Sequence, residues 1–143
     1  MKIGLLSYRS HPYSGGQGIY IKHLSKALHD LGHEVSVLSG PPYPELNNSI
    51  KLIKIPSLGM FETDHRLKVF SLGLLFRPLD LYEWLTVMTG GFPEPYTYGK
   101  RVYKYLKHNK KDFDIILDNQ SLCSSLLKIQ DILPLVVTIH HPI

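Results

Sequence analysis

The opening of the sequence constrains its fold more than any other stretch. An apolar run from Ile3 to Ser7 leads into the loop Ser14-Gly-Gly-Gln-Gly18, and apolar residues then recur at helical spacing from Ile19 to Leu31. Gly32 stands where a helix end needs a left-handed residue, and a second apolar run begins at Glu34. The pattern predicts a strand, a helix and a parallel strand joined by a right-handed crossover.

Further short apolar runs predict the rest of one sheet. They are nearly continuous rather than alternating, which is typical of parallel strands covered by helices on both faces. We therefore expect an α/β fold, a Rossmann-like parallel sheet in three layers. The predicted strands are Ile3 to Ser7, Glu34 to Leu38, Ile50 to Ile55, Phe113 to Leu117 and Leu135 to Ile139.

Helices are predicted between these strands. After the first helix, an interrupted apolar stretch runs from Asp64 to Met88, and Pro78 divides it into two expected helices. A further helix is predicted from Tyr96 to His108. The last one runs from Ser121, as its N-cap, to Ile132.

Composition indicates one domain in a reducing compartment. The sequence has 143 residues, of which 43% are hydrophobic and 20% charged, as an ordinary domain with a core requires. The single cysteine, Cys123, excludes an intrachain disulfide and is expected to be a small buried residue. The first residues do not have the pattern of a secretory signal, so a cytoplasmic location is expected.

A basic surplus points to two kinds of surface. This surplus of basic residues predicts either a solvated helix face or a surface that contacts the inner face of an anionic membrane. Residues 64–88 leave a similar choice between a helical excursion packed on the domain and an amphipathic surface for lipid or a lipid-linked acceptor. No transmembrane helix is predicted, and no nucleic acid is expected, because a reading motif is missing. The surplus lies in Lys100, Arg101, Lys104, Lys107, Lys110 and Lys111.

The glycine loop is a candidate anion site. Unpaired N–H groups and the helix dipole favour a phosphate at a helix start, although a tight turn that merely needs glycine is the alternative. A dinucleotide fingerprint is incomplete, since Ile21 replaces the third glycine and Ser39-Gly40 ends the second strand without an acid. A Walker loop is excluded because no Gly-Lys-Ser/Thr follows.

Polar residues cluster where the fourth and fifth predicted strands end. Asp118-Asn-Gln-Ser121 follows the fourth strand, and His140 and His141 follow the fifth. Ligands of open α/β sheets lie beyond these strand ends, so the clusters should meet the glycine loop. The amides of Asn119 and Gln120 can bind sugar hydroxyls, and the His140 imidazole can donate or accept a hydrogen bond.

Other chemistries have less support. His140 and His141 are neighbours on a strand and point to opposite faces, so no metal site is expected. His11 lies in the first loop, where it either overhangs the crevice or is merely solvated. Hydrolase chemistry is disfavoured because Gly-x-Ser-x-Gly is absent.

Together these residues resemble the N-terminal half of a GT-B glycosyltransferase, of the retaining group 1 or family 4 type. In similar proteins two Rossmann-like domains face each other across a cleft, and the N-terminal one mainly binds the acceptor. The resemblance covers nearly the whole chain in the right order. It rests on Gly15-Gly-Gln-Gly18 with its helix, Gly32-His-Glu-Val35, Phe113-Asp-Ile-Ile116 and Pro134-Leu-Val-Val-Thr-Ile-His140.

The resemblance implies that residues 1–143 are the acceptor-side domain and that a donor-binding C-terminal domain, a partner for this one, is absent. It places Gly15 and Gly16 at the donor diphosphate and makes His140 the catalytic residue near the transferred sugar or the acceptor. A nucleotide-sugar and an acceptor are then the substrates, no metal or other cofactor is expected, and the chain alone should be inactive. Many members carry a histidine where this chain has Asp118-Asn-Gln120. The remaining acceptor or sugar contacts would be Asn119, Gln120, His141 and His11.

Two other functions remain open from the residues alone. One is a non-catalytic Rossmann- or flavodoxin-like module that docks a partner or a membrane through residues 64–111. The other is an NAD-dependent oxidoreductase, which dinucleotide binding would reveal.

Overall fold

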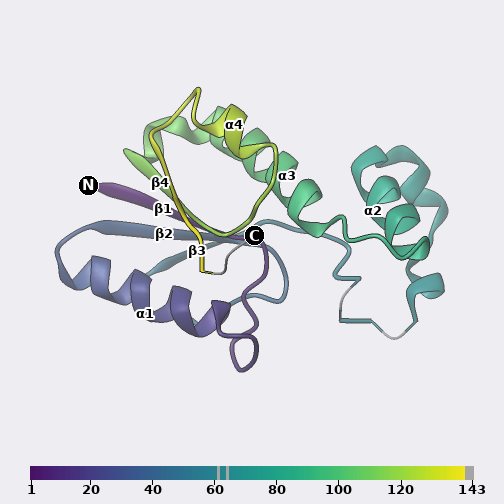
Figure 1. Ribbon diagram of the computed structural model, residues 1–143, viewed down its shortest axis with the longest axis horizontal. Coiled ribbons are helices and arrows are strands. Elements are labelled where there is room, and N and C mark those ends of the chain that lie inside the picture. The colour runs from purple at the N-terminus through teal and green to yellow at the C-terminus, as the bar shows by residue number, and fades with distance from the viewer. Residues whose placement is uncertain (61, 64, 141–143) are drawn as a thin grey trace.

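The computed structural model describes residues 1–60, 62–63 and 65–140, and these form a parallel sheet with helices on both faces (Figure 1). Their five strands have the spatial order β3-β2-β1-β4-β5, and every adjacent pair is parallel. The predicted α/β, Rossmann-like fold is confirmed. The strands are β1 (Lys2–Ser7), β2 (Glu34–Ser39), β3 (Lys51–Lys54), β4 (Ile115–Asn119) and β5 (Leu135–Thr138).

The sheet is the middle layer of three. Successive strand residues point to opposite faces, so Leu5 packs in a cluster with Ile21 of α1, and Leu6 packs in another with Leu106 of α3. Burying one such side chain stabilises the fold by about 1.5–3 kcal/mol, so the two clusters hold the layers together. Helix α1 (Gln17–Asp30) covers one face, and helices α3 (Glu94–Asn109) and α4 (Leu126–Ile129) cover the other (Figure 1).

The strand order places the site. Strands β1 and β4 are neighbours in the sheet although they lie far apart in the sequence, and the order of strands reverses between them. Open α/β sheets bind ligands beyond the carboxyl ends of the strands at such a switch point. The glycine loop follows β1, and residues 120–125 follow β4.

The predicted bounds of one strand, β4, and of the last helix are wrong. Strand β4 lies two residues later than predicted, because Asp118 pairs with β1 and Asn119 pairs with Thr138. The helix predicted from Ser121 to Ile132 is only the four-residue α4. Leu122 has a φ of 47°, a left-handed conformation that cannot belong to a right-handed helix starting at Ser121. The other strands match their predicted bounds to within one residue.

Residues 65–92 form a helical lobe that extends beyond the sheet near the start of α3 (Figure 1). Two helices were expected here, and the first is instead a pair of 3₁₀ turns, Arg66–Val69 and Leu72–Phe76. Ser71 between the turns is extended, with φ −141° and ψ 154°, which interrupts any longer helix. Pro78 begins α2 (Pro78–Met88), where its missing N–H costs nothing.

Arg101 anchors this lobe to α3. Its side chain is only 13% exposed and forms ion pairs with Asp80 and, at 2.7 Å, with Glu83, both on α2. Buried charges need such partners, so the predicted solvated basic face is wrong for Arg101.

The surface of the lobe is apolar and basic. Within its described residues, 65–92, every exposed charged side chain is basic, because the two acids are those that Arg101 binds. In the part of the chain that the structure describes, no helix combines the length and apolar character needed to cross a bilayer. The exposed apolar residues include Leu67, Leu72, Leu75, Phe76 and Leu85.

Candidate functional site

The glycine loop gives α1 an unusual start. Gly15 and Gly16 have φ values of 79° and 72°, which only glycine adopts without strain. The Gln17 N–H donates to the Gly15 carbonyl at 2.8 Å across Gly16, in a three-residue turn. Among the described residues, no side chain caps this helix and its first turn has no acid. The helix start therefore presents positive potential without a carboxylate of its own.

Gly18 has a different role in the same loop. A Cβ at this position would lie 2.1 Å from the carbonyl oxygen of His11, so only glycine lets the loop after β1 pack against α1. The sequence indicated Gly18 only as part of a phosphate motif. The structure shows that it fixes the close approach of loop and helix.

His140 is held from three sides. Its Nε2 lies 2.6 Å from Oδ1 of Asn119, and its backbone N–H donates to Oε1 of Gln120 at 3.0 Å. The ring of Tyr20 meets the imidazole edge-to-face, with centroids 4.7 Å apart. With Nε2–H donating to Asn119, a neutral imidazole keeps Nδ1 as its second hydrogen-bonding atom. The histidine is thus oriented by β4 and α1, while the residue itself remains exposed.

These groups enclose a first hollow, the His140 hollow, of about 300 Å³. Three of the sequence-predicted residues besides His140, namely Gly15, Gly16 and Gln120, line it. Asn119 does not line the hollow itself but contacts His140, which does. Gln17 and Tyr20 also line the hollow, and sequence reasoning missed both as site residues. The sequence could have indicated Tyr20, because it stands four residues after Gly16 and so lies one turn into the predicted helix. In the structure its N–H donates to the Gly16 carbonyl. The lining is Gly15, Gly16, Gln17, Tyr20, Gln120 and His140.

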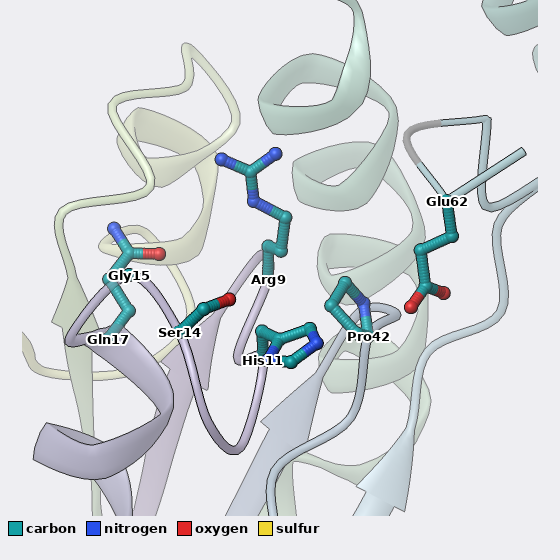
Figure 2. A pocket seen from close by; sticks show the side chains of 7 residues that line it. All are labelled: Arg9, His11, Ser14, Gly15, Gln17, Pro42 and Glu62. Atoms are coloured by element: carbon teal, nitrogen blue, oxygen red, sulfur yellow. The ribbon is translucent and has the colours of Figure 1, made fainter. Parts of the chain in front are cut away.

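A second hollow, of about 560 Å³, lies on the other side of the glycine loop (Figure 2). His11 lines it together with Arg9 and Glu62, so His11 does not join His140. Gly15 and Gln17 line both hollows and separate them. Arg9 and Glu62 were missed because neither belongs to a recognisable motif. This space can accept polar or charged groups of either sign.

Asp118 supports the site from within the protein. It is 1% exposed, and its Oδ2 accepts the Ser121 N–H at 2.9 Å. Burial raises the pKa of this carboxyl above its usual range, against the opposing effect of the hydrogen bond from Ser121. The sequence grouped Asp118 with the polar residues that follow the fourth strand and gave it no role of its own, and the structure buries it. It lies under the loop.

The loop over Asp118 carries backbone strain. Gln120 and Leu122 have φ values of 52° and 47°, which are uncommon for residues other than glycine. Such strain persists where the surroundings over-determine the backbone, often at binding sites. Here it directs Gln120 toward the backbone of His140.

The last of the predicted features are His141, the expected absence of a metal site and Cys123. His141 lies outside the described residues. Within the described ranges, no three or more His, Cys, Asp or Glu side chains are grouped to hold a metal ion. Cys123 is buried as expected, and burial raises the pKa of its thiol.

A comparison with known families shows which family has this fold. Residues 14–143 match the model of Glycosyltransferase Family 4. The chain belongs to glycosyltransferase family 4. The resemblance inferred from the glycine loop and the strand ends is therefore confirmed. Family 4 membership also favours a transferase over a non-catalytic binding module or an oxidoreductase.

A curated relative of this family 4 chain has a named activity. The chain is 46% identical over 145 aligned residues to the MMP alpha-(1->4)-mannosyltransferase of Mycolicibacterium hassiacum. The alignment covers 100% of this chain and 35% of that protein. The chain thus spans about a third of the relative that it matches.

Proposed function

We propose that this chain is the acceptor-side domain of a mannosyltransferase, which transfers mannose from a nucleotide-sugar to a sugar acceptor with retention of the anomeric configuration. The observation that carries the proposal is the His140 hollow, where the uncapped start of α1 faces His140 and Gln120. A diphosphate and a sugar need these two kinds of group side by side. The named activity of the relative suggests mannose and an α-(1→4) linkage.

The glycine loop would stabilise the leaving group. As the bond from the acceptor oxygen to the sugar forms and the bond to the diphosphate breaks, negative charge gathers on the diphosphate, whose oxygen takes up the proton that the acceptor hydroxyl loses. Backbone N–H groups at Gly15 and Gly16 are pre-oriented donors for this charge, and the α1 dipole adds to them. Cations from a second domain would supply the rest.

His140 and Gln120 would hold sugar hydroxyls. The imidazole can turn its Nδ1 to a hydroxyl because Asn119 occupies Nε2. Gln120 keeps an amide NH₂ for a ligand while its oxygen accepts the His140 N–H. His11, in the second hollow, is proposed as a further sugar contact, and so is His141.

Two matched variants of the full-length protein test the loop. Gly15→Leu and Gly32→Leu both place a side chain at positive φ, 79° and 87°, and a Cβ at either site meets no atom within 4 Å. Each should cost about 1–2 kcal/mol of stability. Only Gly15→Leu fills the hollow, so it should lower kcat/KM for mannosyl transfer by about 100-fold or more.

The comparison of the two leucine variants is decisive. Gly32→Leu, at the far end of α1, should leave kcat/KM within about twofold of wild type at temperatures where both variants are folded. Equal kinetics of the two variants would remove the loop from the mechanism.

We propose a second property for the lobe, contact with an anionic membrane surface at the cytoplasmic face. The supporting observation is the coincidence of exposed apolar side chains with exposed charges of one sign, Arg66, Lys68 and Arg77, the last of which also pairs with the buried Asp80 at 2.7 Å. Apolar insertion and attraction to anionic lipid then act together. Co-sedimentation with phosphatidylserine vesicles should fall when these three cations are changed to glutamine, and vesicles of phosphatidylcholine should bind poorly from the start. Equal binding to both vesicles, or to neither, contradicts this proposal.

A further inference from the structure

A third hollow, of about 490 Å³, adjoins the His140 hollow. Its walls come from the end of β1, the start of α3 and the loop after β4, so it opens at the same carboxyl edge of the sheet. Gln120 lines both hollows and forms the wall between them. We name this space the aromatic hollow after its lining, which includes Tyr8, Phe92, Tyr96, Gln120, Ser121 and Ser124.

The rings of the aromatic hollow are presented to solvent. Phe92 is 56% exposed and Tyr96 is 38% exposed. Tyr8 and Phe92 meet edge-to-face with centroids 6.2 Å apart. The Arg9 guanidinium carbon lies 5.6 Å from the Tyr8 centroid and 5.9 Å from that of Phe92, which steadies both rings. The hollow therefore offers apolar ring faces that contact one another and Arg9.

The polar groups of the aromatic hollow are uncharged. Among the described residues that line it, the polar side chains are hydroxyls, the thiol of Cys123 and the amide of Gln120, with no carboxylate, lysine or arginine. The cations of Arg9 and Lys100 do not line the hollow but lie over its rings, Arg9 at Tyr8 and Phe92 and Lys100 at Tyr96. The second hollow differs, since Arg9 and Glu62 line it. Aromatic faces with a few neutral donors and acceptors suit a molecule that has apolar C–H faces and hydroxyls but no charge. A sugar ring has this chemistry, whereas a nucleoside diphosphate does not.

We propose that the aromatic hollow binds a second, uncharged sugar ring of the acceptor. The ring that receives mannose lies in the His140 hollow, and the next ring of the same acceptor lies beyond Gln120. The acceptor is then a disaccharide or longer glycan rather than a single sugar. This inference rests on the proposed function, because it requires a sugar acceptor in the His140 hollow.

The test measures binding without turnover. The full-length protein is titrated by calorimetry with methyl α-mannoside and with its α-(1→4)-linked mannobioside, both without donor. Phe92→Ala removes one ring of the hollow at an exposed position, so the fold should persist. Phe76→Ala is the matched control, because Phe76 is 87% exposed on the lobe and does not line the hollow.

The wild-type protein should bind the mannobioside at least tenfold more tightly than the mannoside. Phe92→Ala should remove most of this difference and leave the mannoside dissociation constant within twofold, and Phe76→Ala should change neither value. Equal binding of both sugars by the wild type, no binding of the mannobioside, or an unchanged preference in Phe92→Ala would overturn the inference.

The proposed function fails in a different way. If the mannobioside binds as expected but no mannose is transferred from any nucleotide-mannose, the second-ring site stands and the transferase proposal falls. If transfer occurs equally well to both sugars and Phe92→Ala has no effect, the transferase stands and the second-ring site falls.

Discussion

At the scale of the residue, the contact between Asn119 and His140 links the sheet to the proposed chemistry. Asn119 is 3% exposed, and its Oδ1 lies 2.6 Å from Nε2 of His140. Its backbone is fixed by pairing with Thr138 in β5. A side chain held this firmly can set the orientation of a neighbouring imidazole that is itself exposed.

Asn119→Ala should therefore act through His140. We expect kcat to fall by about 10- to 100-fold, because a loosened imidazole misplaces the hydroxyl that it holds, with KM for the donor within about twofold. The double variant Asn119→Ala/His140→Ala should be no worse than His140→Ala alone in steady-state kinetics. Asn48→Ala, at an exposed position, is the control. Additive losses in the double variant would show that Asn119 has a role independent of His140.

Asp118 predicts a pH dependence of stability. Burial raises the pKa of this carboxyl in the folded state, so the folded protein binds its proton more tightly than the unfolded chain does. Between the unfolded and folded pKa values, stability from this group falls as pH rises, and it is fully present only below the unfolded pKa. The amide in Asp118→Asn still offers an oxygen to the Ser121 N–H but cannot ionise.

The free energy of unfolding should accordingly fall less steeply with rising pH in Asp118→Asn than in the wild type. Urea unfolding at a series of pH values above the usual aspartate pKa measures the slope. Asp131→Asn, at an exposed position, should retain the wild-type slope. A wild-type slope in Asp118→Asn as well would show that Asp118 does not titrate abnormally.

At the scale of the element, α1 and the loop after β1 behave as one unit. Replacing a helical glycine by alanine normally stabilises a helix by about 0.5–1 kcal/mol. At Gly18 the added Cβ would lie 2.1 Å from the His11 carbonyl oxygen and 2.7 Å from that of Ser10, both backbone atoms that cannot rotate away. The clash of the added Cβ should therefore destabilise the protein by more than the higher helix propensity of alanine stabilises it.

Gly18→Ala should destabilise the protein by about 1–3 kcal/mol, measured by thermal or urea unfolding. Gly73→Ala is the control, since the nearest atom to its Cβ is the Ser71 Oγ at 3.6 Å. A Gly18→Ala variant as stable as the wild type would mean that loop and helix separate easily. The close packing of this unit would then not be what fixes the two hollows on either side of the glycine loop.

At the scale of the whole molecule, the described hollows form a row along one edge of the sheet. The glycine loop divides the first two, and Gln120 divides the His140 hollow from the aromatic hollow. A row of open hollows suits a cleft whose other wall is a second domain. Under the proposed function, the 143-residue polypeptide would contribute one wall of that cleft.

The polypeptide alone should therefore bind a nucleotide-mannose weakly and show no turnover, because one helix dipole and a few N–H groups replace only part of the solvation of a diphosphate. Turnover is measured with a radiolabelled donor, by chromatography of the free mannose or the mannosylated acceptor that forms. Steady transfer by the isolated 143 residues would contradict the two-wall interpretation. The full-length protein is the positive control.

Much of the fold could be predicted because its signals are local. The continuous apolar runs indicated parallel strands, the glycines indicated the start and end of α1, and the order of elements then limited the topology. Predictions failed where one dihedral angle or one cross-strand pair decided the outcome. The positive φ of Leu122 prevents the helix that was predicted from Ser121, and the pairing of Asn119 with Thr138 extends β4.

The sequence by itself determined that Gly15, Gly16, Gln120 and His140 could meet, because residues that follow parallel strands must gather at one edge of the sheet. Only the tertiary structure decided which side chains touch. Tyr20 against His140, Arg101 between two acids and the Phe92 ring beside Tyr8 are contacts between segments far apart in the chain. Such contacts depend on how layers pack, and local residue patterns do not encode the distances between layers.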